Sequence, residues 1–147
     1  MPPLFMEEDI MLEINLGGKP YQIKYAYTPV VKSGILKKLA QMSDGDNGLD
    51  SIDKIMNILP ELILVGLQKN HKKEFGYVYD TNAGKEEKLS KVYDALDDYF
   101  DGENADFMEL FQSLQNELLE NSFLSKMFRE AQEETKNEQK VPEEQKN

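Results

Sequence analysis

Cysteine and tryptophan are absent from the 147 residues of the chain, and histidine occurs once. Without cysteine the chain cannot form a disulfide scaffold, a zinc–thiolate site or an iron–sulfur cluster, and it has no cysteine nucleophile. The cysteine content therefore gives no indication of an oxidising compartment, and a reducing cytoplasm is the default expectation.

Basic residues are scarce relative to acidic ones: 17 Lys and Arg stand against 28 Asp and Glu, which gives a net charge of −11. A protein that binds nucleic-acid phosphates or anionic membranes needs a basic face, so neither partner is expected. The longest apolar stretch, residues 55–67, is interrupted by polar residues and a proline, and it is far shorter than the roughly 20 residues that span a bilayer. Residues 1–9 carry three acids where a signal peptide carries Lys or Arg. We therefore expect a soluble protein.

An alternating pattern near the N-terminus predicts a β-hairpin over residues 10–27, turning at Gly17-Gly18. The first strand places three apolar residues on one face, and the second strand places four, in order Ile10, Leu12, Ile14, Tyr21, Ile23, Tyr25 and Tyr27. A lone two-stranded hairpin is marginally stable in water. It must therefore pack on helices, or another chain must pair with its edge.

Helical spacing of apolar residues predicts about five helices after the hairpin. The first begins at Thr28-Pro29 and runs to about residue 42, and the second is capped by Ser51 and apolar on nearly every side through residue 67. Pro60 should kink this helix or start a new one. The remaining three helices are expected over about 85–100, after Asn104, and after Asn121-Ser122.

The predicted fold class is therefore α+β, mostly α, in a single domain over residues 10–133, with the hairpin at 10–27 and helices from 28 to 133. Residues 1–9 are expected to be flexible. Residues 134–147 are almost entirely Glu, Gln, Lys and Asn, a composition that does not offset its ordering entropy, so a disordered tail is expected.

No pattern in the sequence carries catalytic, cofactor-binding or metal-binding chemistry. His71 lies at a lysine-rich helix end, where a structural role is more ordinary than that of a general base. The acidic runs at 44–48 and 97–106 do not fit an EF-hand loop, and Gly17-Gly18-Lys19 does not fit a P-loop. We therefore predict no catalytic residue, no cofactor, no metal, and a protein that is not an enzyme.

Apolar helical stripes are the remaining signal, and they are too many for a small domain to cover. Uncovered apolar patches mark partner sites, so a helical binding module is expected. Four segments resemble the tail assembly chaperones of long-tailed, siphovirus-type phages of Gram-positive bacteria: NILPELILVGLQKNHKKEFGY at 57–77, KVYDALDDYFD at 91–101, DFMELF at 106–111 and ELLENSFL at 117–124. The hairpin with its Gly-Gly turn also fits that family.

The resemblance implies a non-catalytic assembly factor of the host bacterial cytoplasm that is absent from the mature virion. Such proteins bind the tape measure protein, keep it soluble and help to recruit the tail tube protein. We predict a groove for an amphipathic helix, and a homo-oligomer that associates through the hairpin. The predicted groove residues are Leu62, Leu64, Leu67, Phe107, Phe111, Leu114, Leu118, Leu124, Met127 and Phe128. The predicted self-association residues are Ile10, Leu12, Ile14, Tyr21, Ile23 and Tyr25.

The acidic charge leaves a second interpretation open. Residues 77–128 hold twelve acidic and four basic residues. An acidic phage regulator that mimics DNA and occupies the basic groove of a host factor would carry such a segment. Salt distinguishes the two interpretations, because binding by a mimic should collapse as salt rises and binding by an apolar groove should not.

Overall fold

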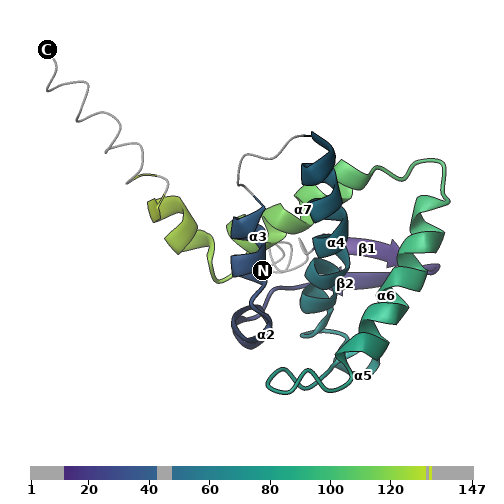
Figure 1. The fold of residues 1–147 in the computed structure, drawn as a ribbon. Coiled ribbons are helices and arrows are strands. Elements are labelled where there is room, and N and C mark those ends of the chain that lie inside the picture. The colour runs from purple at the N-terminus through teal and green to yellow at the C-terminus, as the bar shows by residue number, and fades with distance from the viewer. Residues whose placement is uncertain (1–11, 43–47, 132, 134–147) are drawn as a thin grey trace, which may run out of the picture.

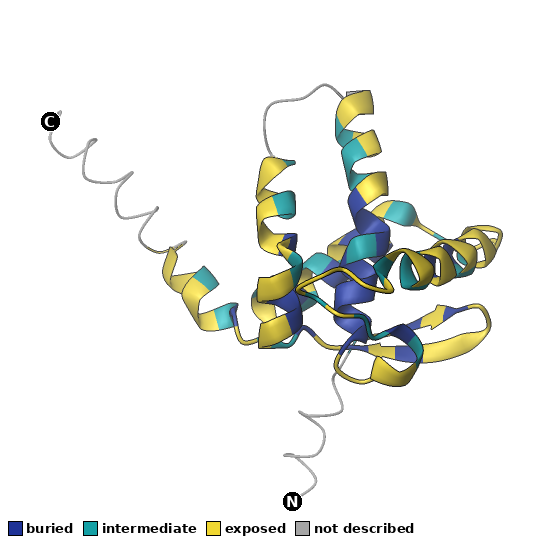
Figure 2. Cartoon of the chain, turned by 60° about the horizontal axis from the view of Figure 1, so that its bottom comes forward, coloured by how far each residue is buried: buried dark blue, intermediate teal, exposed yellow. Residues whose placement is uncertain are grey.

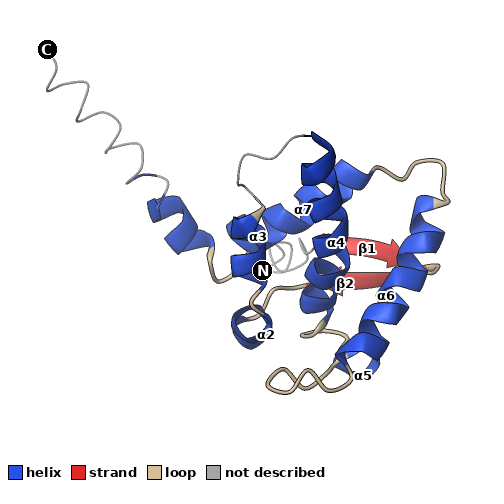
Figure 3. Ribbon diagram, viewed as in Figure 1, coloured by secondary structure: helices blue, strands red, loops and turns tan. Residues whose placement is uncertain are grey.

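The computed structural model describes residues 12–42, 48–131 and 133, and in this part of the chain the protein is mostly helical (Figure 1). The predicted fold class is confirmed: an N-terminal hairpin is followed by helices (Figure 3). The elements are, in order, β1 Leu12–Leu16, β2 Lys19–Ile23, α2 Tyr27–Ser33, α3 Ile35–Gln41, α4 Gly48–Leu67, α5 Lys72–Phe75, α6 Lys85–Phe100, α7 Phe107–Glu120 and a last helix at 125–131. The predictions for residues 1–9, Ile10 and 134–147 lie outside the described residues.

The hairpin forms at the predicted turn, with shorter strands than predicted. β1 and β2 pair antiparallel from Leu12 opposite Ile23 to Leu16 opposite Lys19. Gly17 and Gly18 have φ values of +59° and +81°, which is the left-handed backbone that a two-residue hairpin turn requires. Side chains alternate between the core and solvent along both strands.

The end of β2 is bound to α4 and to the turn that follows it. The backbone N–H of Lys24 donates to the carbonyl of Gly66 at 2.9 Å, and the N–H of Gln22 donates to His71 Nε2 at 3.0 Å. The Tyr25 hydroxyl donates to the carbonyl of Leu62 at 2.9 Å. These bonds give the hairpin the helical support that it needs for stability.

α4 is the central helix, since it contacts β2, α2, α3, α5, α6 and α7. Its two halves differ in burial. From Ile58 to Gln68 every residue except Glu61 is buried, whereas residues 49–57 are exposed or half-buried (Figure 2). The helix therefore has an inner half inside the core and an outer half that projects beyond it.

Several predicted helix boundaries are wrong, for local reasons. α4 runs unbroken through Pro60, so no new helix starts there. The predicted helix over 28–42 is divided at Gly34, whose φ of +71° is left-handed and ends α2 before α3 begins. Thr28 and Ser51 lie inside helices rather than at their caps. Asp106, not Asn104, caps α7, since its carboxylate accepts from the backbone N–H of Glu109 at 3.1 Å.

Among the residues that the structure describes, Gln68 is the polar residue buried in the core, and the periodicity of the sequence did not indicate it. The Gln68 Nε2 donates to the carbonyls of Leu64 and Phe75 at 3.1 and 2.7 Å, and its Oε1 accepts from the Tyr79 hydroxyl at 3.0 Å. All its polar atoms are thus paired, as buried polar groups require. Gln68 joins the end of α4 to α5 and to the loop that leads to α6.

No helix in the described part of the chain is both long enough and apolar enough to cross a membrane.

Candidate partner-binding surfaces

Most residues of the predicted binding groove lie in the core instead. The hairpin, α6 and α7 pack around the inner half of α4 and close off the side chains that the sequence analysis expected to be open. Leu62, Leu64, Leu67, Phe111, Leu114, Leu118 and Leu124 are all buried. Phe107 and Phe128 are half-buried, and only Met127 is well exposed. A groove built from the buried leucines and Phe111 is therefore wrong for this fold.

The residues predicted for self-association also face inward. Ile14, Tyr21, Ile23 and Tyr25 are buried, and Leu12 is half-buried against the same core. The outer edge of β2 is occupied as well, because Gln22 and Lys24 already donate to His71 and Gly66. The side chains of the hairpin therefore support the fold, and association of a second chain through the hairpin edge stays a prediction.

Three exposed apolar side chains lie on the outer half of α4. Leu49, Ile52 and Met56 are 80%, 46% and 56% exposed. Their spacing of three and four residues places them on one side of the helix. We call these three residues the α4 stripe. The sequence analysis missed Leu49 because it started this helix at Ser51, and it could not separate Ile52 and Met56 from the leucines of the inner half.

A groove lies between α3 and the outer half of α4. It encloses about 370 Å³ and is lined by Lys38, Gln41, Met42, Asp53, Lys54, Asn57, Ile58 and Glu61. Six of the eight lining residues are polar or charged, with charges of both signs, while carbon atoms contribute the larger part of the surface exposed in the groove. Such a groove can contact both the apolar and the polar side of a bound helix.

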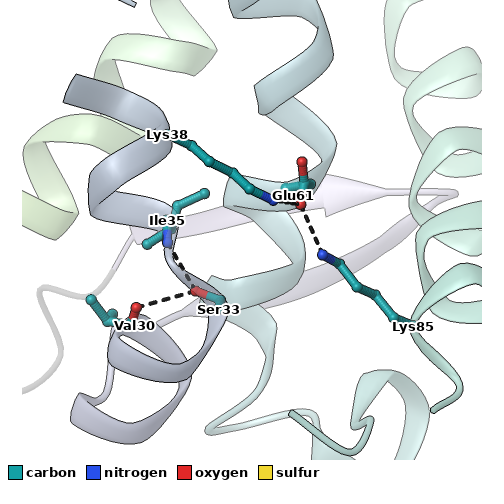
Figure 4. A network of polar contacts seen from close by, with 6 residues as sticks. All are labelled: Val30, Ser33, Ile35, Lys38, Glu61 and Lys85. Carbon is teal, nitrogen blue, oxygen red and sulfur yellow. Dashed lines mark hydrogen bonds and ion pairs between the residues drawn. The ribbon is translucent and has the colours of Figure 1, made fainter. Parts of the chain in front are cut away.

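Glu61 lines this groove and joins three helices (Figure 4). Its Oε1 accepts from the ammonium of Lys38 on α3, and from that of Lys85 at the start of α6 at 3.0 Å. Burial alone would raise the pKa of Glu61, but the hydrogen bonds and charges of the two lysines outweigh it and hold the pKa below the ordinary value of 4.5.

This arrangement predicts a pH-dependent contribution to stability. Because the pKa of Glu61 is lower in the folded state, its contribution is present above pH 4.5 and is lost as the pH falls through the folded-state pKa. We expect Glu61→Gln to lower the free energy of unfolding by about 1–2 kcal/mol at pH 7, and by less at pH 3.5. Urea titrations at both values measure this. Glu87→Gln is the control, since Glu87 is exposed and its 3.5 Å ion pair with Lys88 should contribute little.

His71 has a structural place, as the sequence analysis favoured. Its Nε2 accepts from Gln22, and its ring meets the ring of Tyr21 edge-on with centroids 4.8 Å apart. The Tyr21 hydroxyl in turn donates to Glu74 at 3.0 Å. Within the described ranges, no group of three or more His, Asp or Glu side chains is placed to hold a metal ion.

Comparisons of the chain with protein-family models, with curated proteins and with solved structures each gave no match.

Proposed function

We propose that this protein is a non-catalytic phage tail assembly chaperone that binds the tape measure protein and keeps it soluble until the tail tube forms. In this proposal it acts in the host cytoplasm, helps to recruit the tail tube protein and does not remain in the virion. The resemblance of four segments to that family motivates the proposal. The observation that carries it in the fold is the α4 stripe, an exposed apolar row on a helix that projects from the core.

The stripe suits the apolar side of another helix. A helical partner presents anchors at spacings of three and four residues, which is also the spacing of Leu49, Ile52 and Met56. Burying each side chain contributes about 1–2 kcal/mol, so a single copy binds weakly. A long helical protein offers many such rows, and several copies bound along it would cover its apolar surface.

The test is co-expression with the tape measure protein encoded in the same phage genome. We expect the tape measure protein to stay soluble with this chain and to precipitate without it. The variant Leu49→Gln, Ile52→Gln, Met56→Gln should lose this effect while keeping its fold, because exposed positions tolerate substitution and glutamine favours helix.

Val78→Thr is the matched control, because Val78 is exposed and apolar but lies in the loop before α6. It should keep the tape measure protein soluble as well as the original chain does. Equal precipitation with and without this chain would contradict the proposed function.

An acidic regulator that mimics DNA remains the second candidate. Residues 93–109 contain seven acidic residues and no basic one, which favours it. If this interpretation holds, the chain will bind a basic host factor, and binding will fall steeply as the salt concentration rises from about 0.05 to about 0.5 M. Over this range the Debye length falls from about 14 to about 4 Å, so interactions between exposed charges are increasingly screened. Binding through the α4 stripe should change little over the same range.

A further inference from the structure

An exposed carboxylate borders the α4 stripe on the side of the groove. Asp53 follows Leu49 by four residues and precedes Met56 by three, so it lies next to both on the surface of the helix. Asp53 also lines the groove between α3 and α4. It therefore stands where the apolar row of the stripe meets the groove.

The carboxylate of Asp53 is not engaged within the described part of the protein. No ion pair of the described residues includes it, and the bond from Asn57 Nδ2, at 2.8 Å, ends on the backbone carbonyl of Asp53. The two lysines of the groove, in contrast, have interactions of their own. Lys38 donates to Glu61, and Lys54 interacts within the protein as well. Asp53 can therefore receive a cation from a partner.

The opposite border of the α4 stripe is apolar. Ile55 and Leu59, three and seven residues after Ile52, lie on that side of the helix, the first half-buried and the second buried. The stripe is thus asymmetric, with a negative charge on the border that faces the groove and apolar side chains on the other. A helix that matches both borders must itself be charged along one edge only.

We infer that the helix bound by the α4 stripe carries Lys or Arg along one edge of its apolar row, and that one of these cations pairs with Asp53. Met42 and Ile58 line the groove and offer apolar surface to the aliphatic stem of that side chain. The net charge of −11 attracts such a helix from a distance. This inference rests on the proposed function, and it names the class of tape measure segment that the chain binds: an amphipathic helix with one basic edge.

The apolar row and the carboxylate have different effects on binding. Three apolar side chains supply most of the affinity, because an exposed ion pair contributes little by comparison. The ion pair instead discriminates between partners, since a helix with an acidic edge meets repulsion at Asp53 where a basic one meets attraction. Salt should therefore weaken binding only slightly, while the sign of the charge on the edge should matter.

The test uses two synthetic helical peptides and the purified full chain. Both peptides carry leucines spaced by three and four residues and a hydrocarbon staple that keeps them helical. One edge of the leucine row is lysine in the basic peptide and glutamate in the acidic peptide. Amide NMR signals of the isotope-labelled chain, at about 0.15 M salt, measure weak dissociation constants and locate the bound peptide. We expect the basic peptide to bind about five times more tightly and to shift the signals of α4 and α3 around the stripe and groove.

Variants separate the local charge from the net charge. Asp53→Lys should reverse the order of the two peptides. Glu13→Lys is the matched control, because it changes the net charge equally at an exposed position on β1, and it should keep the original order. The triple glutamine variant of the α4 stripe should bind both peptides at least about tenfold more weakly. Circular dichroism checks that each variant is folded.

An unchanged order of the peptides in Asp53→Lys overturns the inference, because the preference then comes from the net charge alone. Equal affinity for the two peptides, no binding, or signals that shift only outside the stripe and groove overturn it as well. Co-expression tests the proposed function separately. If the tape measure protein stays soluble with the chain but the peptides show no preference, the function stands and this inference fails. If the preference is found but the tape measure protein precipitates, the proposed function fails and the stripe binds a different basic-edged helix.

Discussion

Gly66→Ala will destabilise the protein by about 2 kcal/mol, even though alanine is the better helix former by about 1 kcal/mol. A Cβ at this position would lie 2.7 Å from Ile23 Cγ2 and 3.1 Å from Tyr25 Cζ. Both side chains are buried and have no room to retreat. The hairpin would have to move away from α4, which would stretch the bond from the Lys24 N–H to the Gly66 carbonyl.

Urea unfolding of the original chain and of Gly66→Ala measures this effect. The control is Ile23→Ala, made alone and combined with Gly66→Ala. Ile23→Ala removes the atom that the new Cβ would meet, so the double variant should be more stable than the sum of the two single effects predicts. Strict additivity, or a Gly66→Ala variant as stable as the original chain, would show that the close approach of β2 to α4 does not restrict this position.

Leu62→Ala will lower the free energy of unfolding by about 3 kcal/mol, through lost burial and the cavity that remains. Leu62 lies fully inside the core on the inner half of α4. Ile52→Ala, on the outer half of the same helix, should cost well under 1 kcal/mol, since Ile52 is partly open to solvent. Urea unfolding of both variants gives the comparison.

For the proposed binding to the tape measure protein we expect the opposite ranking of the two variants, with Ile52→Ala having the larger effect. Under conditions in which Leu62→Ala is folded, this variant should bind the tape measure protein as the original chain does. Ile52→Ala should remain stable but bind the tape measure protein more weakly. If Leu62→Ala instead stayed stable and lost binding, the groove predicted from sequence would be correct and the assignment of the α4 stripe would be wrong.

Local patterns predicted much of the fold. The alternation of Leu12, Ile14, Tyr21 and Ile23 and the Gly17-Gly18 turn are properties of a few neighbouring residues, and they fix a hairpin in its observed register. Helical spacing likewise located α4, α6 and α7. The errors at Thr28, Ser51 and Asn104 arose because each of these residues can cap a helix, whereas the observed helices start two to four residues away from the predicted positions.

The exposed α4 stripe could not be predicted in the same way. Leu62 and Met56 belong to one apolar helix, and no local property says that the hairpin and α6 cover the first and leave the second open. That outcome depends on how distant segments pack, including the approach of β2 to Gly66. The all-round apolar character of the helix agrees with its contacts to several neighbouring elements, but it did not indicate which end lacks them.

Pro60 lies two residues after the point where α4 enters the core. Because proline has no N–H, the carbonyl of Met56 lacks its helical donor, and one backbone hydrogen bond of α4 is missing where the two halves meet. We therefore expect the outer half to open at a lower free energy than the rest of the domain. If a partner helix binds the α4 stripe as proposed, we expect the outer half of α4 to adjust its position while the packing of the core stays unchanged.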